Sequence, residues 1–122
     1  MDRISPLPLL VSVPHGGLSI PEEARSACAL KLPDILADGD TWARTLYDLP
    51  EKVRCFLAAD VARAVVDLNR PENHRAPDDP DGALKSRTLS GVPVWKTAGA
   101  PSDELAEQLL AQHHRPYHEQ LA

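Results

Sequence analysis

The sequence is poor in aromatic residues, which make up 4% of its 122 positions. Any core must therefore rest on aliphatic side chains, chiefly leucine, valine and alanine. Cysteine is also scarce, because Cys28 and Cys55 are the two that the chain has. They are too few and too far apart for a metal-binding cysteine cluster. The simplest interpretation is two reduced intracellular thiols, with a disulfide between them left open.

An excess of basic residues is missing too, since the formal net charge is -5. This argues against nucleic acid as a partner, because phosphate binding requires a basic face. No apolar run reaches the length of a membrane span. Asp2 and two prolines interrupt the first thirteen residues, which therefore do not resemble a signal peptide. The sequence predicts a single soluble domain, residues 1–122, in the cytoplasm, with no membrane partner.

Two apolar runs are each followed by polar residues of the kind that bind ligands. Leu9–Val13 predicts a strand, and the sequence Pro-His-Gly-Gly follows it at 14–17. Val53–Ala59 predicts another strand, which leads into a third at Ala62–Leu68. In open α/β sheets, ligands bind beyond the carboxyl ends of the strands. If the strands are parallel, His15 and Arg70 lie at the same edge of the sheet.

The second polar cluster, Asp67–Pro71, reads Asp-Leu-Asn-Arg-Pro. Arg70 offers a planar fork of donors that fits a carboxylate in a bidentate way, and the Asn69 amide can donate and accept beside it. The cluster therefore predicts a site for a small acidic ligand. Blander interpretations stay open: an Asn-Arg pair is also typical of a surface salt bridge, and a histidine after a strand is typical of a solvated loop.

Four elements of the chain resemble the N-formylglutamate amidohydrolases, zinc-dependent hydrolases related in fold to the zinc carboxypeptidases and aspartoacylases. Their order and spacing match across nearly the whole chain. The Asp-Leu-Asn-Arg element is the most specific of them; the family more often has serine at the position of Gly16. The elements are Val13–Gly17, Asp38–Trp42 with Leu46–Asp48 after it, Ala64–Pro71 and Arg115–His118.

The resemblance implies roles for individual residues. His15 matches the first zinc ligand, and Asn69 and Arg70 match the pair that holds the substrate carboxylate. Asp40 is the candidate for the acidic zinc ligand, with Glu22 and Glu23 as weaker alternatives. The implied substrate is a small acidic N-acyl amino acid, N-formyl-L-glutamate, which is hydrolysed to glutamate and formate. The implied fold is an α/β domain with a mainly parallel sheet flanked by helices, as in the zinc carboxypeptidases.

Asp40 has a second interpretation that involves no metal. It can cap a helix whose apolar positions would be Trp42, Leu46 and Leu49, which lie close to helical spacing. The two interpretations are equally favoured by the sequence. A short helix from Pro21 and a longer one capped by Ser102, interrupted at Pro116, are also expected.

The chain departs from the family in lacking the later strand that ends in Asp-x-His and supplies another zinc ligand. His113, His114 and His118 lie on a helical stretch, where a solvated or packed side chain is the favoured interpretation. We therefore expect the N-terminal portion of an amidohydrolase-like domain. The alternatives are a non-catalytic carboxylate-binding module and an inactive fragment without the zinc ligand and general base of the later half.

Two expectations concern surfaces. Without later strands one sheet edge stays open, which predicts a homo-oligomer or aggregation through that edge. Residues 71–87 hold three prolines and no periodicity, so they predict a long irregular loop. Because this loop follows Arg70, it is either a lid over the substrate or a disordered surface segment.

Overall fold

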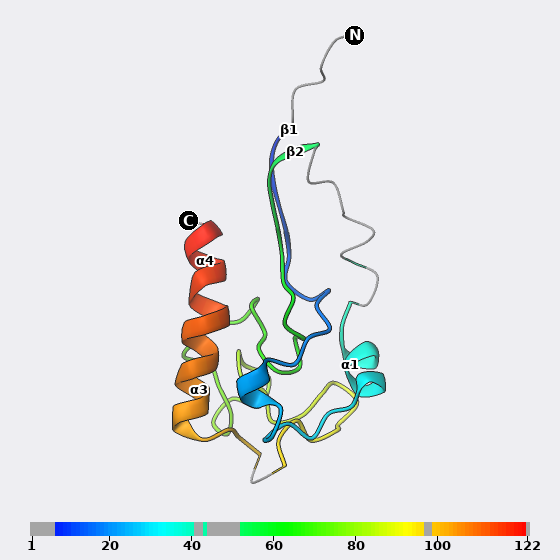
Figure 1. Cartoon of the computed structure of the whole chain (residues 1–122), viewed down its shortest axis with the longest axis vertical. Helices are drawn as coiled ribbons and strands as arrows, with labels where there is room; N and C mark the ends of the chain where they lie inside the picture. The colour runs from blue at the N-terminus through cyan, green and yellow to red at the C-terminus, as the bar shows by residue number, and fades with distance from the viewer. Residues whose placement is uncertain (1–6, 41–42, 44–51, 97–98, 122) are drawn as a thin grey trace.

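The computed structural model describes residues 7–40, 43, 52–96 and 99–121 (Figure 1). Short regular elements alternate with long irregular segments, and the chain is of the α/β class. In chain order, the elements are β1 (Leu7–Val13), the 3₁₀ turn η1 (Glu22–Ala24), α1 (Leu32–Asp38), β2 (Val53–Ala58), α3 (Asp103–Leu109), the π-helical turn η2 (Leu110–His114) and α4 (Arg115–Leu121).

The sheet formed by the described residues consists of β1 and β2, which run parallel. Leu10 pairs with Cys55 and Val13 with Ala58, and the register is irregular between Leu7 and Leu10. Both strands were predicted from their apolar runs, and both predictions are confirmed. In Figure 1 the pair extends away from the rest of the molecule, so much of it is uncovered. No helix among the described residues is long and apolar enough to cross a membrane.

The strand predicted at Ala62–Leu68 is wrong. Single parallel bridges join Gly17 to Ala62 and Ser19 to Val61, and the chain then turns instead of extending. The backbone N–H groups of Val65 and Val66 both donate to the Ala62 carbonyl, at 3.0 and 3.1 Å. The segment is buried all the same, and periodicity alone cannot separate a buried strand from another buried conformation. The apolar run therefore indicates that the segment is buried, but it does not determine the conformation of the backbone.

Gly17 allows the two segments to come this close. A Cβ at Gly17 would lie 2.4 Å from the Val61 carbonyl oxygen, a distance that no side chain tolerates. The turn after His15 is therefore fixed against the segment that leads to Asp67. The segments that follow β1 and β2 therefore stay side by side beyond the ends of the strands, in the irregular part of the chain where the candidate site lies.

The helix α1, which the sequence did not predict, ends beside the turn at His15. It starts with Asp34 accepting a hydrogen bond from the Lys31 N–H at 2.9 Å, and Pro33 lies in its first turn. At its other end the Asp40 N–H donates to the His15 carbonyl at 3.0 Å. The expected helix from Pro21 is a single 3₁₀ turn, η1. The expected helix through Trp42, Leu46 and Leu49 lies outside the described residues.

The C-terminal helix begins as predicted, with Ser102 Oγ accepting from the Leu105 N–H at 3.2 Å. It continues as one rod through α3, η2 and α4 (Figure 1). The expected interruption at Pro116 takes the form of the π-helical turn η2 just before it. Proline lacks an N–H and its ring clashes with the carbonyl four residues earlier, so a widened turn relieves both problems.

The core is aliphatic, as the scarcity of aromatic residues predicts. Its fully buried side chains include Val65, Val66, Leu84 and Leu109, and Trp95 is its one large aromatic member apart from Tyr117 among the described residues. Cys28 and Cys55 are free thiols. Residues 88–92 form a tight turn in which the Thr88 N–H donates to the Val92 carbonyl at 2.9 Å and Gly91 has a φ of 86°.

Candidate functional site

The site is built around His15, which follows β1 directly. Its Nε2 lies 2.7 Å from Asp67 Oδ1, and Asp67 is fully buried. Burial alone would raise the pKa of the Asp67 carboxyl, but hydrogen bonds from His15 and the Asn69 N–H, together with the charge of Lys85, hold that pKa well below its usual range. Asp67 is therefore ionised, so Nε2 of His15 carries the hydrogen and donates it. In the neutral form of the ring, the lone pair lies on Nδ1.

The buried carboxylate of Asp67 is paired with two cations and accepts a backbone hydrogen bond. Lys85 Nζ lies 3.0 Å from its Oδ2 and Arg63 Nη2 lies 3.4 Å from the same oxygen. The Asn69 N–H donates to Oδ1 at 2.9 Å. A buried charge is tolerated when it is paired and hydrogen-bonded, and here both conditions hold. His15 is thus held by a rigid carboxylate and not by a mobile surface group.

Asp40 lies on the other side of the imidazole. Its Oδ2 is 3.6 Å from His15 Nδ1, and its side chain is 62% exposed. Two ligand atoms of one tetrahedral zinc lie roughly 3.4 Å apart, so these two atoms are spaced as a pair of metal ligands would be. A histidine whose other nitrogen donates to a carboxylate is typical of zinc sites. The spacing and chemistry of His15 Nδ1 and Asp40 Oδ2 are those of a candidate pair of metal ligands.

The described residues hold no group of three histidine, cysteine or acidic side chains around one point. A catalytic zinc usually has three protein ligands, so a further ligand is needed beyond His15 and Asp40. Glu23, one of the weaker alternatives, is engaged elsewhere, since its Oε1 lies 2.9 Å from His113 Nε2. Asp40 is the carboxylate that lies beside His15 Nδ1, as Asp67 lies beside Nε2.

Arg70 lies three residues beyond Asp67 and is anchored to the loop at 71–87. Its Nε donates to the Asp81 carbonyl at 3.2 Å, and its Nη2 lies 3.5 Å from Asp81 Oδ2. A third hydrogen bond joins Nη1 to the Asn69 carbonyl at 3.2 Å. The side chain of Arg70 is one-third exposed, and the Asn69 side chain is exposed beside it. The guanidinium is oriented by its own chain, which is the arrangement that a carboxylate clamp needs.

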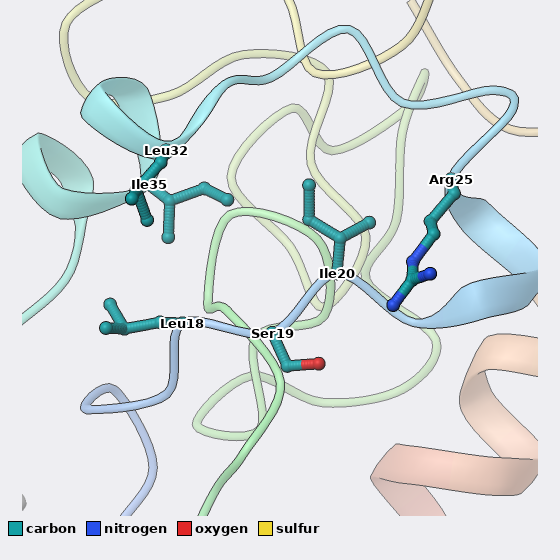
Figure 2. A pocket seen from close by; sticks show the side chains of 6 residues that line it. All are labelled: Leu18, Ser19, Ile20, Arg25, Leu32 and Ile35. Carbon is teal, nitrogen blue, oxygen red and sulfur yellow. The ribbon is translucent and has the colours of Figure 1, made fainter.

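A separate hollow of about 340 Å³ lies between α1 and the segment after Gly17 (Figure 2). None of the candidate site residues lines it. Leu18, Ile20, Leu32 and Ile35 give it an apolar wall, and Arg25 stands at its rim.

Comparison with known proteins identifies the family. The family model described as N-formylglutamate amidohydrolase matches residues 7–122. The chain belongs to the N-formylglutamate amidohydrolase family. It is 34% identical over 115 residues to an N-formylglutamate deformylase of Pseudomonas putida. The aligned region covers 92% of this chain and 43% of that protein. It is 34% identical over 119 residues to another from Pseudomonas aeruginosa strain PAO1, covering 95% and 44%.

The fold is shared with a solved structure that carries the same family name. The crystal structure of N-formylglutamate amidohydrolase from Ralstonia eutropha JMP134 superposes with a TM-score of 0.72 at 20% identity, over 99% of this chain and 48% of that one. The chain therefore spans less than half the length of the amidohydrolases that it matches. The resemblance read from its motifs is confirmed at the level of the family.

Two histidines of the C-terminal helix support the backbone of the segment that carries Asn69 and Arg70. His114 Nε2 donates to the Arg70 carbonyl at 2.7 Å, and His118 Nε2 donates to the Leu68 carbonyl at 2.6 Å. Their rings stack with centroids 4.5 Å apart, and His113 pairs with Glu23. His114 and His118 thus bind backbone carbonyls and contact each other, while His113 binds a carboxylate. The four-residue spacing of His114 and His118 places both on one helix face, a signal that sequence reasoning did not use.

Sequence reasoning also missed Lys85 and Arg63, the two cations that hold Asp67. Lys85 stands in a polar, proline-rich region and has no neighbour in sequence that marks it as buried. Arg63 lies four residues before Asp67, inside the run mistaken for a strand. A lysine is almost never fully buried unless it is paired, so its burial could be inferred only from Asp67 and its surroundings in the folded chain.

Proposed function

We propose that this chain supplies the N-terminal part of the active site of a metal-dependent amide hydrolase that converts N-formyl-L-glutamate and water to glutamate and formate. One observation carries the proposal: His15 is oriented by the buried Asp67 so that Nδ1 faces Asp40 at 3.6 Å. Membership of the amidohydrolase family and the names of the Pseudomonas relatives support the substrate. The proposal extends to a zinc carboxypeptidase-like fold for the whole enzyme.

His15 and Asp40 would hold the metal, zinc by preference, because imidazole nitrogen and carboxylate oxygen are ligands that zinc commonly takes. When bound, zinc lowers the pKa of a water molecule and polarises the amide carbonyl. The third ligand and the general base would come from the part of the enzyme that the relatives have beyond the matched region. Asp67 keeps the hydrogen of His15 on Nε2, so that Nδ1 is ready to bind.

Arg70 and Asn69 would bind a carboxylate of the substrate. The two outer nitrogens of a guanidinium match the two oxygens of a carboxylate, and the Asn69 amide can donate to the same group. Asp81 holds Arg70 in one orientation before the substrate arrives, so less side-chain freedom is lost on binding. The clamp acts by positioning the formyl amide and takes no part in the bond-breaking step.

The test measures zinc and formate on one preparation, in which the 122-residue chain is fused to the later part of the Pseudomonas putida relative that lies beyond the matched region. Zinc near one equivalent and formate released from N-formyl-L-glutamate support the proposal, and His15→Ala should lose both. His74→Ala, which changes an exposed loop histidine, is the matched control and should lose neither. Glutamate binding without zinc would instead support a carboxylate-binding module. A chain with neither property is an inactive fragment, and the proposal would be wrong for it.

A further inference from the structure

Lys85 is the most deeply buried cation among the described residues, with 1% of its surface exposed. Its Nζ lies 3.0 Å from Asp67 Oδ2 and 2.5 Å from Asp81 Oδ1. A lysine loses much side-chain freedom and hydration when it is buried, so it must be fixed by strong partners. Two carboxylates on different segments provide them, and Lys85 consequently joins those segments.

Each of the two carboxylates has a second partner that belongs to the candidate site. Asp67 accepts the hydrogen bond from His15 Nε2 at 2.7 Å. Asp81 accepts from the guanidinium of Arg70 through its backbone carbonyl, at 3.2 Å, and contacts it through Oδ2 at 3.5 Å. An unbroken sequence of contacts therefore leads from the imidazole through Asp67, Lys85 and Asp81 to the guanidinium.

We propose that Lys85 is a positioning residue that fixes the metal-binding His15 and the carboxylate-binding Arg70 at a set distance from each other. This inference rests on the proposed function, because the roles of His15 and Arg70 come from that proposal. The ammonium suits the task, since its three donors reach two carboxylates at once in a compact volume. Its backbone is held as well, because Trp95 Nε1 donates to the Lys85 carbonyl at 2.8 Å.

A fixed distance between the clamp and the metal has a consequence for specificity. The substrate must span from its bound carboxylate to its amide, so a rigid spacing selects acidic N-acyl amino acids by their reach. Loosening Lys85 should weaken the discrimination between N-formyl-glutamate and the shorter N-formyl-aspartate. A positioning group that is slightly misplaced can still bind the ligand, but it then holds the reacting atoms in a poorer geometry and the rate falls.

The test compares Lys85→Met with Asp81→Ala, which cuts the connection at its exposed end. Nitrogen-15 NMR follows two hydrogen-bonded groups in each variant, the Nε2–H of His15 and the Nη2–H of Arg70, which faces Asp81 Oδ2. In Lys85→Met both resonances should shift and exchange faster with water. In Asp81→Ala only the Arg70 resonance should change, and glutamate should bind about threefold more weakly, as the loss of an exposed ion pair allows. Asp78→Ala, which removes an exposed aspartate of the same loop, should change neither.

The two variants keep the inference falsifiable even if Lys85→Met does not fold, because Asp81 is 59% exposed and its removal leaves the core intact. Unchanged resonances of Arg70 in Asp81→Ala would overturn the inference. So would an unchanged His15 resonance in folded Lys85→Met. If the wild-type chain shows the expected resonances and binds neither zinc nor glutamate, the proposed function fails while the positioning by Lys85 stands. Preference for N-formyl-glutamate over N-formyl-aspartate should fall in Asp81→Ala and persist in Asp78→Ala.

Discussion

Asp67 bears on both the stability and the chemistry of this protein. It is fully buried, touches Lys85 and Arg63, and orients His15. A single ionised carboxylate thus neutralises cations that would otherwise be buried alone. It also sets which nitrogen of the imidazole faces Asp40. Its substitution should therefore change unfolding and metal binding together.

We expect Asp67→Asn to lower the free energy of unfolding by about 3 kcal/mol, because Lys85 loses a buried partner. Zinc affinity should fall by about tenfold or more, since the amide cannot hold His15 as a carboxylate does. Urea unfolding and zinc titration measure the two effects. Asp78→Asn, which removes the same charge from an exposed site, serves as the control and should leave both near wild type.

The depressed pKa of Asp67 also predicts a pH dependence. Because its folded pKa lies below the unfolded value of about 3.9, the folded state binds fewer protons, and the carboxylate contributes stability that is complete above that unfolded value. This stability is lost as the pH falls from about 4 toward the lower folded pKa. Urea unfolding at a series of acidic pH values should show the loss in the wild type and a flatter profile in Asp67→Asn. Equal profiles would contradict the assignment.

Arg70→Lys should raise KM for N-formyl-L-glutamate by about tenfold or more, with a smaller effect on kcat. An ammonium is a point charge and cannot reproduce the two parallel hydrogen bonds of a guanidinium. Steady-state kinetics on the active protein separates the two constants. Arg87→Lys is matched to it, because Arg87 is an exposed arginine that donates to the Gly91 carbonyl. An unchanged KM in Arg70→Lys would show that Arg70 does not bind the substrate carboxylate.

At the scale of elements, the C-terminal helix supports a segment that has no regular structure of its own. His114 donates to the Arg70 carbonyl and His118 to the Leu68 carbonyl. These two hydrogen bonds stand in place of the strand pairing that the sequence had predicted. The segment that carries Asn69 and Arg70 is therefore supported by a helix that lies more than forty residues later in the chain. Loops that bind ligands are usually positioned by a rigid scaffold, and here α3, η2 and α4 provide it.

His118→Ala should loosen this segment without unfolding the protein. The loss of one hydrogen bond should cost about 1 kcal/mol locally. Amide hydrogen exchange at Asn69 and Arg70 should become faster, while exchange in β1 and β2 stays the same. Glu119→Ala, at the next position of α4, is exposed and should leave all of these amides unchanged.

The elements that sequence patterns predicted were those whose causes are local. The strands β1 and β2 are short apolar runs, and the cap of α3 is a serine followed by acidic residues. The segment 62–68 was mispredicted because its apolar run reflects burial on all sides, which depends on tertiary contacts such as that of Gly17 with Val61. Likewise, His15, Asn69 and Arg70 were found as motifs. The paired burial of Lys85 and the helix-to-loop bonds of His114 and His118 depend on distant partners.

At the scale of the whole molecule, the sheet of β1 and β2 exposes large apolar side chains. Leu7, Leu9 and Leu10 are 54, 52 and 48% exposed on β1. Parallel sheets normally have both faces covered, and two strands alone are barely stable in water. Within the described part of the chain, neither strand pairs with a third. Such an edge is a template for another strand.

We therefore expect the isolated 122-residue chain to self-associate, with the edge of one copy pairing with the same edge of a second. Light scattering coupled to size-exclusion chromatography should show a mass that rises with concentration. Leu9→Lys should reduce the association, because a charge on an edge strand opposes pairing. Leu89→Lys, at a leucine that is 71% exposed away from the sheet, should not. A monomer at all concentrations would contradict the expectation.

The hydrogen bond from Trp95 to the Lys85 carbonyl gives the protein a built-in optical probe. Trp95 is 3% exposed and is one of two tryptophans in the sequence, the other being Trp42. In a Trp42→Phe background, all indole fluorescence would come from the ring that touches the backbone of Lys85. Because Trp95 is buried, its emission maximum should lie at a shorter wavelength than that of a tryptophan exposed to water. Any ligand that shifts the Asp81–Lys85 segment would change the spectrum, so occupancy of the clamp could be read without a label.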